Sequence, residues 1–227
     1  MFVAGVDGCR AGWVCFKVEA TSLATSVEVI DLPELLKNRP NDLACLGIDI
    51  PIGLLNGPRA CDTAARKLLK QPRGRSVFSA PCRASLLATT YANANRINRE
   101  KTESGLSQQS YCIGPKIKQV DDAITPDCQK WAFEVHPEVC FWALNQQSPM
   151  KHSKKTEEGR NTRLELLSPV FPGIGHLLAD RPSGVAKDDL LDAAAAAWTA
   201  LRLHKSDALN VCQPESDERG LAVTICY

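Results

Sequence analysis

Acidic residues stand at four places in the chain where a strand is expected to end or a helix to begin. Asp7 follows the apolar run 1–6, Asp49 follows the run 44–48, Glu134 follows the run 131–133, and Asp189 and Asp192 open an alanine-rich stretch. A carboxylate at the end of a buried run is unfavourable unless it is paired, hydrogen-bonded or bound to a cation. The repeated pattern predicts carboxylates that converge on a divalent metal.

The chemistry expected of such a site is metal-dependent phosphoryl transfer. Carboxylate oxygens are the protein ligands of Mg²⁺ and Mn²⁺. Two ions about 3.5–4 Å apart can activate a water molecule and stabilise the leaving oxygen of a phosphodiester. Asp189 and Asp192 are spaced i, i+3 and share one helix face, whereas Asp188 fits either a ligand or a helix-terminus acid. We therefore expect two Mg²⁺ or Mn²⁺ ions at Asp7, Asp49, Glu134, Asp189 and Asp192.

Each acid also has an ordinary structural explanation. Asp7 with Gly8 is typical of a hairpin turn, and Asp49 before Ile50 and Pro51 fits a loop cap. Glu134 could pair with a basic neighbour, and the acids near 188 suit the start of a helix. A metal site is favoured because all of these acids occur together.

Basic residues gather in two segments, 59–83 and 151–163, and suit a phosphate-bearing substrate although the net charge is only +1. Arg73 and Arg163 belong to these segments. His136, two residues after Glu134, is a candidate to orient water or a capping residue before Pro137. The candidate substrate contacts are Arg59, Arg66, Arg75, Arg83, Lys116, His136, Lys154 and Lys155.

The elements that would position these residues are those of an α/β protein. Strands are predicted at 2–7, 12–18, 26–30, 44–49 and 131–135, three of them antiparallel and the others parallel, as in the mixed sheet of the ribonuclease H-like fold. Helices are predicted at 32–37, 59–70, 84–102, 115–125, 137–145, 157–168 and 187–203, with a loop over 71–83 and an edge strand within 220–227. The chain is predicted to be a single domain, 1–227, with a helical insertion at about 55–130 between the fourth and fifth strands.

Composition excludes several protein classes. No apolar run approaches the roughly eighteen residues of a membrane-spanning helix, and we expect a cytoplasmic protein without a signal peptide. The ten cysteines include no C-x-x-C pair and favour buried free thiols over a zinc site. Neither a P-loop nor a dinucleotide-binding glycine motif is present.

Ordered motifs run through most of the chain, at 5–14, 47–54, 59–66, 76–81, 115–121, 134–138, 154–159 and 188–193. With them the chain resembles the predicted RNase H-like nucleases, an uncharacterised group catalogued as a domain of unknown function. The resemblance implies a ribonuclease H-like fold with its site at Asp7, Asp49, Glu134 and the helix acids. The D-x-x-D-A sequence at 189–193 is similar to that of Holliday-junction resolvases, and dimers common in the superfamily make a homodimer an expectation.

The leading hypothesis is a metal-dependent nuclease or phosphodiesterase. One alternative is an enzyme that binds a nucleotide or a phosphorylated metabolite on the same fold. Another is a non-catalytic binding protein that uses the insertion to hold a partner. The sequence leaves open whether the substrate is DNA, RNA or a small phosphoester.

Overall fold

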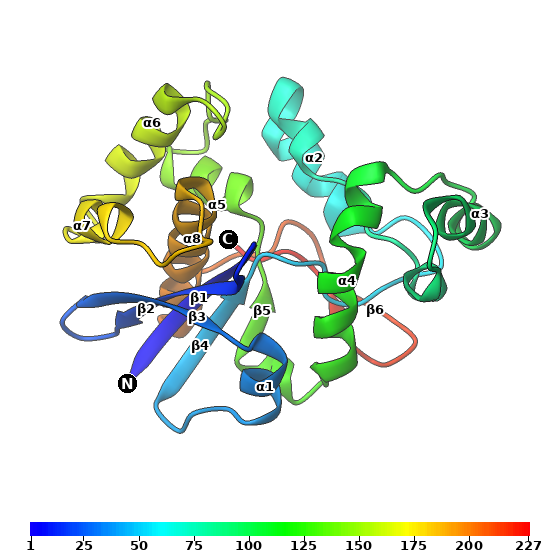
Figure 1. Ribbon diagram of the computed structural model, residues 1–227, viewed down its shortest axis with the longest axis horizontal. Helices are drawn as coiled ribbons and strands as arrows, with labels where there is room; N and C mark the ends of the chain where they lie inside the picture. The colour runs from blue at the N-terminus through cyan, green and yellow to red at the C-terminus, as the bar shows by residue number, and fades with distance from the viewer.

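A five-stranded mixed sheet lies at the centre of the protein in the computed structural model, which describes residues 1–227 (Figure 1). Its strands are β1 (Phe2–Cys9), β2 (Gly12–Glu19), β3 (Thr25–Ile30), β4 (Leu43–Ile48) and β5 (Ala132–Glu134). They lie in the order β3-β2-β1-β4-β5, with β1, β2 and β3 antiparallel and β1, β4 and β5 parallel. The predicted α/β mixed sheet is confirmed, and it is consistent with a ribonuclease H-like sheet.

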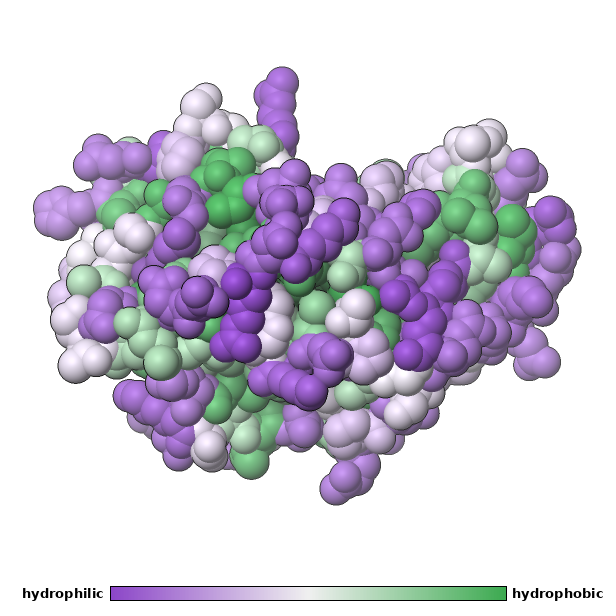
Figure 2. Space-filling view, turned by 90° about the horizontal axis from the view of Figure 1, so that it is seen from below, coloured by the Kyte–Doolittle hydropathy of each residue, from purple (hydrophilic) through white to green (hydrophobic).

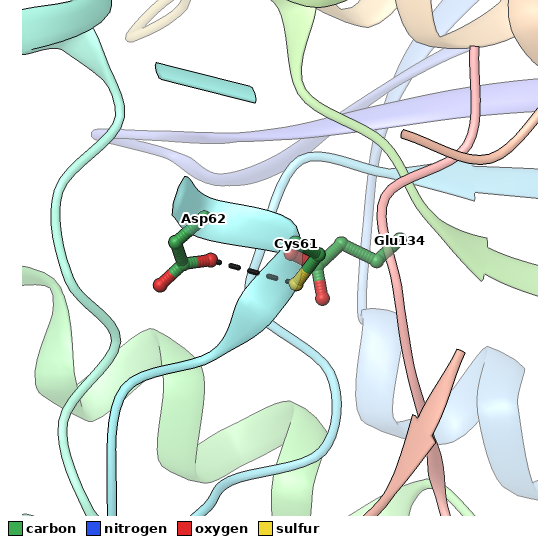
Figure 3. A group of neighbouring side chains, drawn as sticks. All are labelled: Cys61, Asp62 and Glu134. Carbon is green, nitrogen blue, oxygen red and sulfur yellow. Dashed lines mark hydrogen bonds between the residues drawn. The ribbon is translucent and has the colours of Figure 1, made fainter. Parts of the chain in front are cut away.

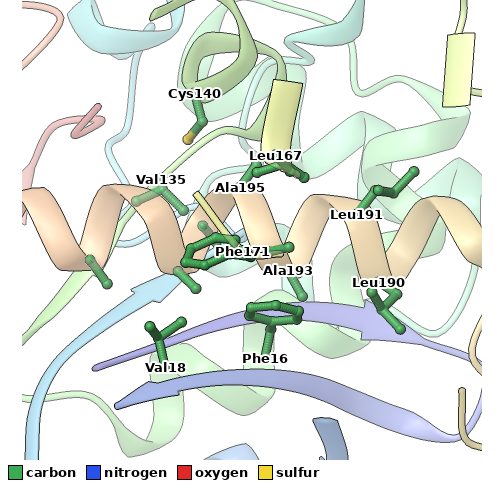
Figure 4. Packing of buried hydrophobic residues seen from close by; sticks show 14 of the residues in the cluster. Phe16, Val18, Val135, Cys140, Leu167, Phe171, Leu190, Leu191, Ala193 and Ala195 are labelled. Atoms are coloured by element: carbon green, nitrogen blue, oxygen red, sulfur yellow. The ribbon is translucent and has the colours of Figure 1, made fainter. Parts of the chain in front are cut away.

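Strands β1, β2 and β4 are buried on both faces because they carry apolar residues on both sides of the pleat, whereas the edge strand β3 has no fully buried residue. Val3 and Phe16 belong to the core that packs against helix α8 (Lys187–His204). Residues of α6 (Glu157–Leu167) and α7 (Ile174–Ala179) belong to the same core. Figure 4 shows Phe16 and Val18 facing Phe171 and the alanines of α8. Val6 and Ile48 belong to the opposite core, against α1 (Leu32–Lys37) and α4 (Gln108–Ala123).

Helix α8 lies unusually close to the sheet because glycine occupies the facing positions of β1 and β4. A Cβ on Gly5 would lie 2.0 Å from the backbone nitrogen of Ala197, and one on Gly47 would lie 2.6 Å from the Ala196 oxygen. Gly5 and Gly47 are register partners in neighbouring parallel strands. Small residues on both sides therefore set the distance between α8 and the sheet.

The segment between β4 and β5 is mostly helical. It contains α2 (Ala60–Arg73), the 3₁₀ turns η1 (Gly74–Ser76) and η2 (Arg83–Leu87), α3 (Tyr91–Thr102), α4 and the turn η3 (Cys128–Lys130). Figure 1 shows α2, α3 and α4 on one side of the molecule and α5 (Pro137–Leu144), α6 and α7 on the other.

Five sequence-based expectations are corrected. The predicted helix over 84–102 is interrupted, because Ala88 and Thr90 have extended backbones and the Thr90 side chain caps α3. Helix α4 begins at Gln108 after its cap Ser107, well before Pro115. The predicted loop over 71–83 begins with helical turns, and α7 was not predicted. In the tail, only β7 (Ala222–Val223) is a strand, paired with β6 (Glu215–Ser216).

The surface exposes few large apolar side chains. They are Met1, Val29, Leu87 and Leu209. On the face drawn in Figure 2, apolar residues form separate patches among polar ones. None of the helices combines the length and apolar composition needed to cross a bilayer.

Candidate metal centre

Asp7, Asp49 and Asp192 converge at the edge of the sheet where β1 and β4 end. One carboxylate oxygen from each lies within 4.8 Å of the others. The alternation of side chains along a strand explains the positions of Asp7 and Asp49. Asp7 points to the same face as Val3 and Gly5, and Asp49 to the same face as Gly47. Both carboxylates are thus on the face that α8 covers. Asp192 completes the group from the second turn of α8.

The three carboxyl groups disfavour one another's ionisation. Burial raises the pKa of Asp7 well above its ordinary value, and repulsion by Asp49 and Asp192 adds to the increase. Burial and the Asp192 charge raise the pKa of Asp49 to about 7. Burial also raises the pKa of Asp192 against the opposing effect of Lys154. A cation placed among these groups would stabilise their ionised forms.

Two neighbouring lysines pair with acids of α8. The Lys154 ammonium donates to Asp192 Oδ2, and Lys155 Nζ donates to Asp188 Oδ2 at 2.5 Å. Asp188 is thereby engaged in an ion pair, and its pKa is lowered by the hydrogen bond and charge of Lys155 against the effect of burial. Asp189 Oδ2 accepts from the backbone nitrogen of Ala186 at 3.1 Å, which satisfies a donor at the start of α8.

Glu134 lies in a second buried group, with Cys61 and Asp62 from the start of α2 (Figure 3). Its Oε2 accepts from the Arg59 guanidinium at 2.5 Å and from the backbone nitrogen of Ile52 at 2.6 Å. Arg59 Nε also lies 3.7 Å from Asp62. The cation of this second group is therefore Arg59, a residue of the protein itself.

A cleft of about 540 Å³ opens between the metal-site edge of the sheet and the helical insertion. Asp7, Asp49, Glu134, Asp189, His136, Lys154 and Lys155 line it on the sheet side, and Arg73, Ser76, Phe78, Gln109 and Ile113 line it on the insertion side. Its walls carry six carboxylates, of Asp7, Asp49, Asp62, Glu134, Glu138 and Asp189, against the three basic side chains of Arg73, Lys154 and Lys155. A phosphate entering this cleft would meet repulsion unless a further cation were bound.

The other basic candidates lie in different surroundings. Arg59 is only 2% exposed and pairs with Glu134. Arg66 donates to Val77 O and Ser79 Oγ, both at 2.8 Å, and so orders the segment after η1. Lys116 Nζ donates to Gly12 O at 2.6 Å and lies over the Trp13 ring. Arg75 is exposed outside the cleft lining, and Arg83 binds Asp121, Asp217 and Glu218.

His136 stands at the N-cap position of α5 without a capping hydrogen bond from its side chain, and it lines the cleft. Its Nδ1 is buried without a hydrogen-bond partner. Burial and the Lys154 charge lower the pKa of His136 to about 4, so the imidazole is neutral near pH 7.

Several cleft residues were not found by sequence reasoning. Glu138 and Arg163 form a fully buried ion pair, so Arg163 cannot bind a phosphate from the cleft. Phe78 and Gln109 come from the insertion. Phe78 belongs to the motif 76–81, which does not indicate a cleft, and no local pattern distinguishes Gln109. The i, i+4 spacing of Glu134 and Glu138 was visible, but it alone could not show that Glu138 Oε2 is buried without a partner.

The carboxylates suit a hard divalent ion. They offer only oxygen, which Mg²⁺ and Mn²⁺ prefer. Asp192 is 1% exposed, and its Oδ1 has no hydrogen-bond partner although its Oδ2 is paired. A buried unsatisfied carboxylate oxygen is unfavourable, and a bound cation would satisfy it.

One comparison with known proteins gives a match. A family model described as a protein of unknown function, DUF429, matches residues 5–218. No curated protein and no solved structure matches the chain.

Proposed function

This protein belongs to the DUF429 family, and we propose that it is a divalent-metal-dependent hydrolase of phosphodiesters, with a nuclease as the leading possibility. The observation that carries the proposal is the convergence of Asp7, Asp49 and Asp192 around one point. The raised pKa values of these groups support it, because they show the cost of keeping three carboxylates together without a cation.

Asp7, Asp49 and Asp192 would hold Mg²⁺ or Mn²⁺ through carboxylate oxygens. A bound ion supplies a Lewis acid and activates water for attack on phosphorus. Asp189 lines the same cleft, and a second ion would require its carboxylate in addition to the central three. Glu134 would act mainly by fixing the loop after β4, since it holds the backbone nitrogen of Ile52 close to Asp49.

The substrate would lie between the two walls of the cleft. Arg73 and Lys155 present cations to its phosphates from opposite sides, and Phe78 offers an aromatic surface. His136 lines the same cleft and is neutral at pH 7, so it adds no charge to the site. The sheet order and the position of these acids also support the proposed kinship with ribonuclease H-like enzymes.

The test is Mn²⁺-dependent hydrolysis by the wild type and Asp7→Asn. A panel of single-stranded DNA and RNA, their duplexes and bis(p-nitrophenyl) phosphate covers the substrate classes. We expect turnover that requires the metal and falls at least about a hundredfold in Asp7→Asn, because a ligand is lost. Equal turnover by the variant would refute the assignment of Asp7.

A separate arm addresses the small-molecule alternative. Protection against thermal unfolding by ATP with Mg²⁺, but not by any nucleic acid, would instead indicate an enzyme acting on a nucleotide or phosphorylated metabolite. Retention of partner binding by the Asp7→Asn variant without any hydrolysis by the wild type would indicate a binding protein.

A further inference from the structure

We propose that the Lys154 ammonium is the second cation of the metal centre, so that the centre takes up one divalent ion rather than a pair. The inference rests on the proposed metal centre and concerns how many ions it accepts. It assigns Lys154 the role of a charge partner to the metal-binding carboxylates, apart from any contact with substrate.

The first argument is the position of the ammonium. The Lys154 ammonium donates to Asp192 Oδ2. The Asp192 carboxylate is also the one that lies beside those of Asp7 and Asp49. Its side chain is 34% exposed, against 74% for the adjacent Lys155, which pairs with Asp188. Lys154 therefore points inward to the centre, whereas Lys155 lies along its outer rim.

The second argument is that the segment carrying Lys154 is held in place. Arg160 Nη1 donates to the Lys155 carbonyl at 2.8 Å, and Arg163 Nη1 donates to the His152 carbonyl at 3.1 Å. Arg163 is itself fixed by its buried pairing with Glu138. These bonds hold the backbone on both sides of Lys154, so its side chain starts from a fixed position beside Asp192.

The third argument is the supply of ligands. A second ion would need carboxylates beyond the central three, and the remaining acids of the cleft already have at least one oxygen engaged. Glu138 pairs with Arg163 through Oε1 and keeps only Oε2 free. Glu134 is bound to Arg59, and one oxygen of Asp189 accepts from Ala186 N. Three carboxylate charges are balanced by one divalent ion together with one ammonium, so a second ion would leave the centre with excess positive charge.

The experiment counts Mn²⁺ bound to the full chain by calorimetry and by electron paramagnetic resonance. Resonance distinguishes an isolated ion from a coupled pair at the spacing of about 3.5–4 Å that two-metal sites have. The variants are Lys154→Met, Lys154→Arg and Lys155→Met. Lys154→Arg retains the positive charge, and Lys155→Met removes the same charge from the neighbouring position outside the centre.

We expect one isolated ion in the wild type, Lys154→Arg and Lys155→Met. In Lys154→Met we expect a second ion, or binding of the first at least about fivefold tighter, because a repelling charge is gone. Circular dichroism and thermal unfolding establish that each variant is folded. If Lys154→Met does not fold, a wild-type stoichiometry of one with an isolated-ion spectrum supports the proposal, and a coupled pair overturns it.

Other outcomes decide between the two proposals. A coupled pair in the wild type, or a single ion with less than about fivefold tightening in Lys154→Met, overturns the role of Lys154. Absence of binding in both the wild type and Lys154→Met overturns the metal centre as well. One bound ion without hydrolysis of any phosphoester overturns the proposed activity but leaves the role of Lys154 intact.

Discussion

At the scale of single residues, the protein keeps carboxylates in places where they are costly. Asp7, Asp49 and Asp192 lie together under a helix, and only one of them has a basic partner. Such an arrangement lowers the stability of the folded protein, and proteins keep it where function requires it. The cost has a measurable dependence on pH, because each group binds a proton more readily in the folded protein than in the unfolded chain.

We predict that the metal-free protein loses stability as pH rises from 6.5 to 8. The pKa of Asp49 is raised to about 7, whereas in the unfolded chain it is about 3.9. The folded state therefore binds more protons in this window, and Asp49 alone lowers the free energy of unfolding by about 1 kcal/mol, or about 2–4 °C in Tm. Burial raises the pKa of Glu134 to about 8, so this group adds to the decline in the wild type and in the variant alike. His136, whose pKa is lowered to about 4, is neutral in both states over most of this window.

The measurement is thermal unfolding in a chelator across this range, with Asp49→Asn as the comparison. The variant should show a shallower decline. Mn²⁺ should restore more stability at pH 8 than at pH 6.5, because protons then compete less for the carboxylates. An identical slope in both proteins would contradict the assignment.

The pairing of Arg59 with Glu134 gives a second prediction for single residues. Arg59→Met leaves the buried Glu134 carboxylate without its cation, and we expect a loss of about 3–5 kcal/mol in urea unfolding. Arg96→Met is the control, since Arg96 pairs with Glu100 on the exposed side of α3 and should change stability by less than about 0.5 kcal/mol. Similar effects of the two substitutions would show that the Arg59 pair is not buried in solution.

At the scale of elements, the centre depends on how closely α8 approaches β1 and β4. The alanines of α8 and the glycines of the strands allow the backbones to come together. This contact brings Asp192 to the ends of the two strands. The distance between α8 and the sheet therefore determines the geometry of the metal centre.

We predict that Gly5→Ala destabilises the protein by about 1–3 kcal/mol, because a methyl group would overlap the α8 backbone. The same change should weaken Mn²⁺ binding by moving Asp192 away from Asp7. Gly57→Ala is the matched control, since nothing lies within 4 Å of the added methyl. Urea unfolding and Mn²⁺ titration of both variants check this, and equal stability would contradict the close packing.

At the scale of the whole molecule, partly buried polar contacts as well as apolar packing tie the insertion to the sheet and to the C-terminal tail. Lys116 reaches the turn between β1 and β2, and Arg83 reaches the loop after β6 through Asp217. These contacts hold the two walls of the cleft in one arrangement. The same packing encloses most of the cysteines.

We predict that few thiols react in the folded protein. Cys112 is exposed and Cys212 half-buried, whereas the other eight of the ten cysteines are buried and none is in a disulfide. A thiol reagent should modify Cys112 rapidly, Cys212 slowly and the rest only after unfolding in urea. Rapid reaction in Cys112→Ser of more than one thiol would contradict the packing.

The sequence by itself determined the sheet and the first half of the centre. Apolar runs with a period of two predict strands, and carboxylates towards the carboxyl ends of two neighbouring parallel strands lie at the same edge of the sheet. The structure extends β1 to Cys9, so Asp7 stands inside that strand and Asp49 directly after β4. Asp7 and Asp49 could be placed together for this local reason. The alanines after Asp192 likewise indicated a helix lying close to the sheet.

Only the tertiary structure decided which charges meet. Arg59 and Glu134 are 75 residues apart, and Lys154 and Asp192 are 38 apart. The basic residues that the sequence suggested as substrate contacts have three different positions in the structure. Some are buried in ion pairs with acids, some lie on the surface, and some line the cleft. Ion pairing depends on distance and burial in three dimensions, and neither is encoded in the local spacing that reveals strands and helices.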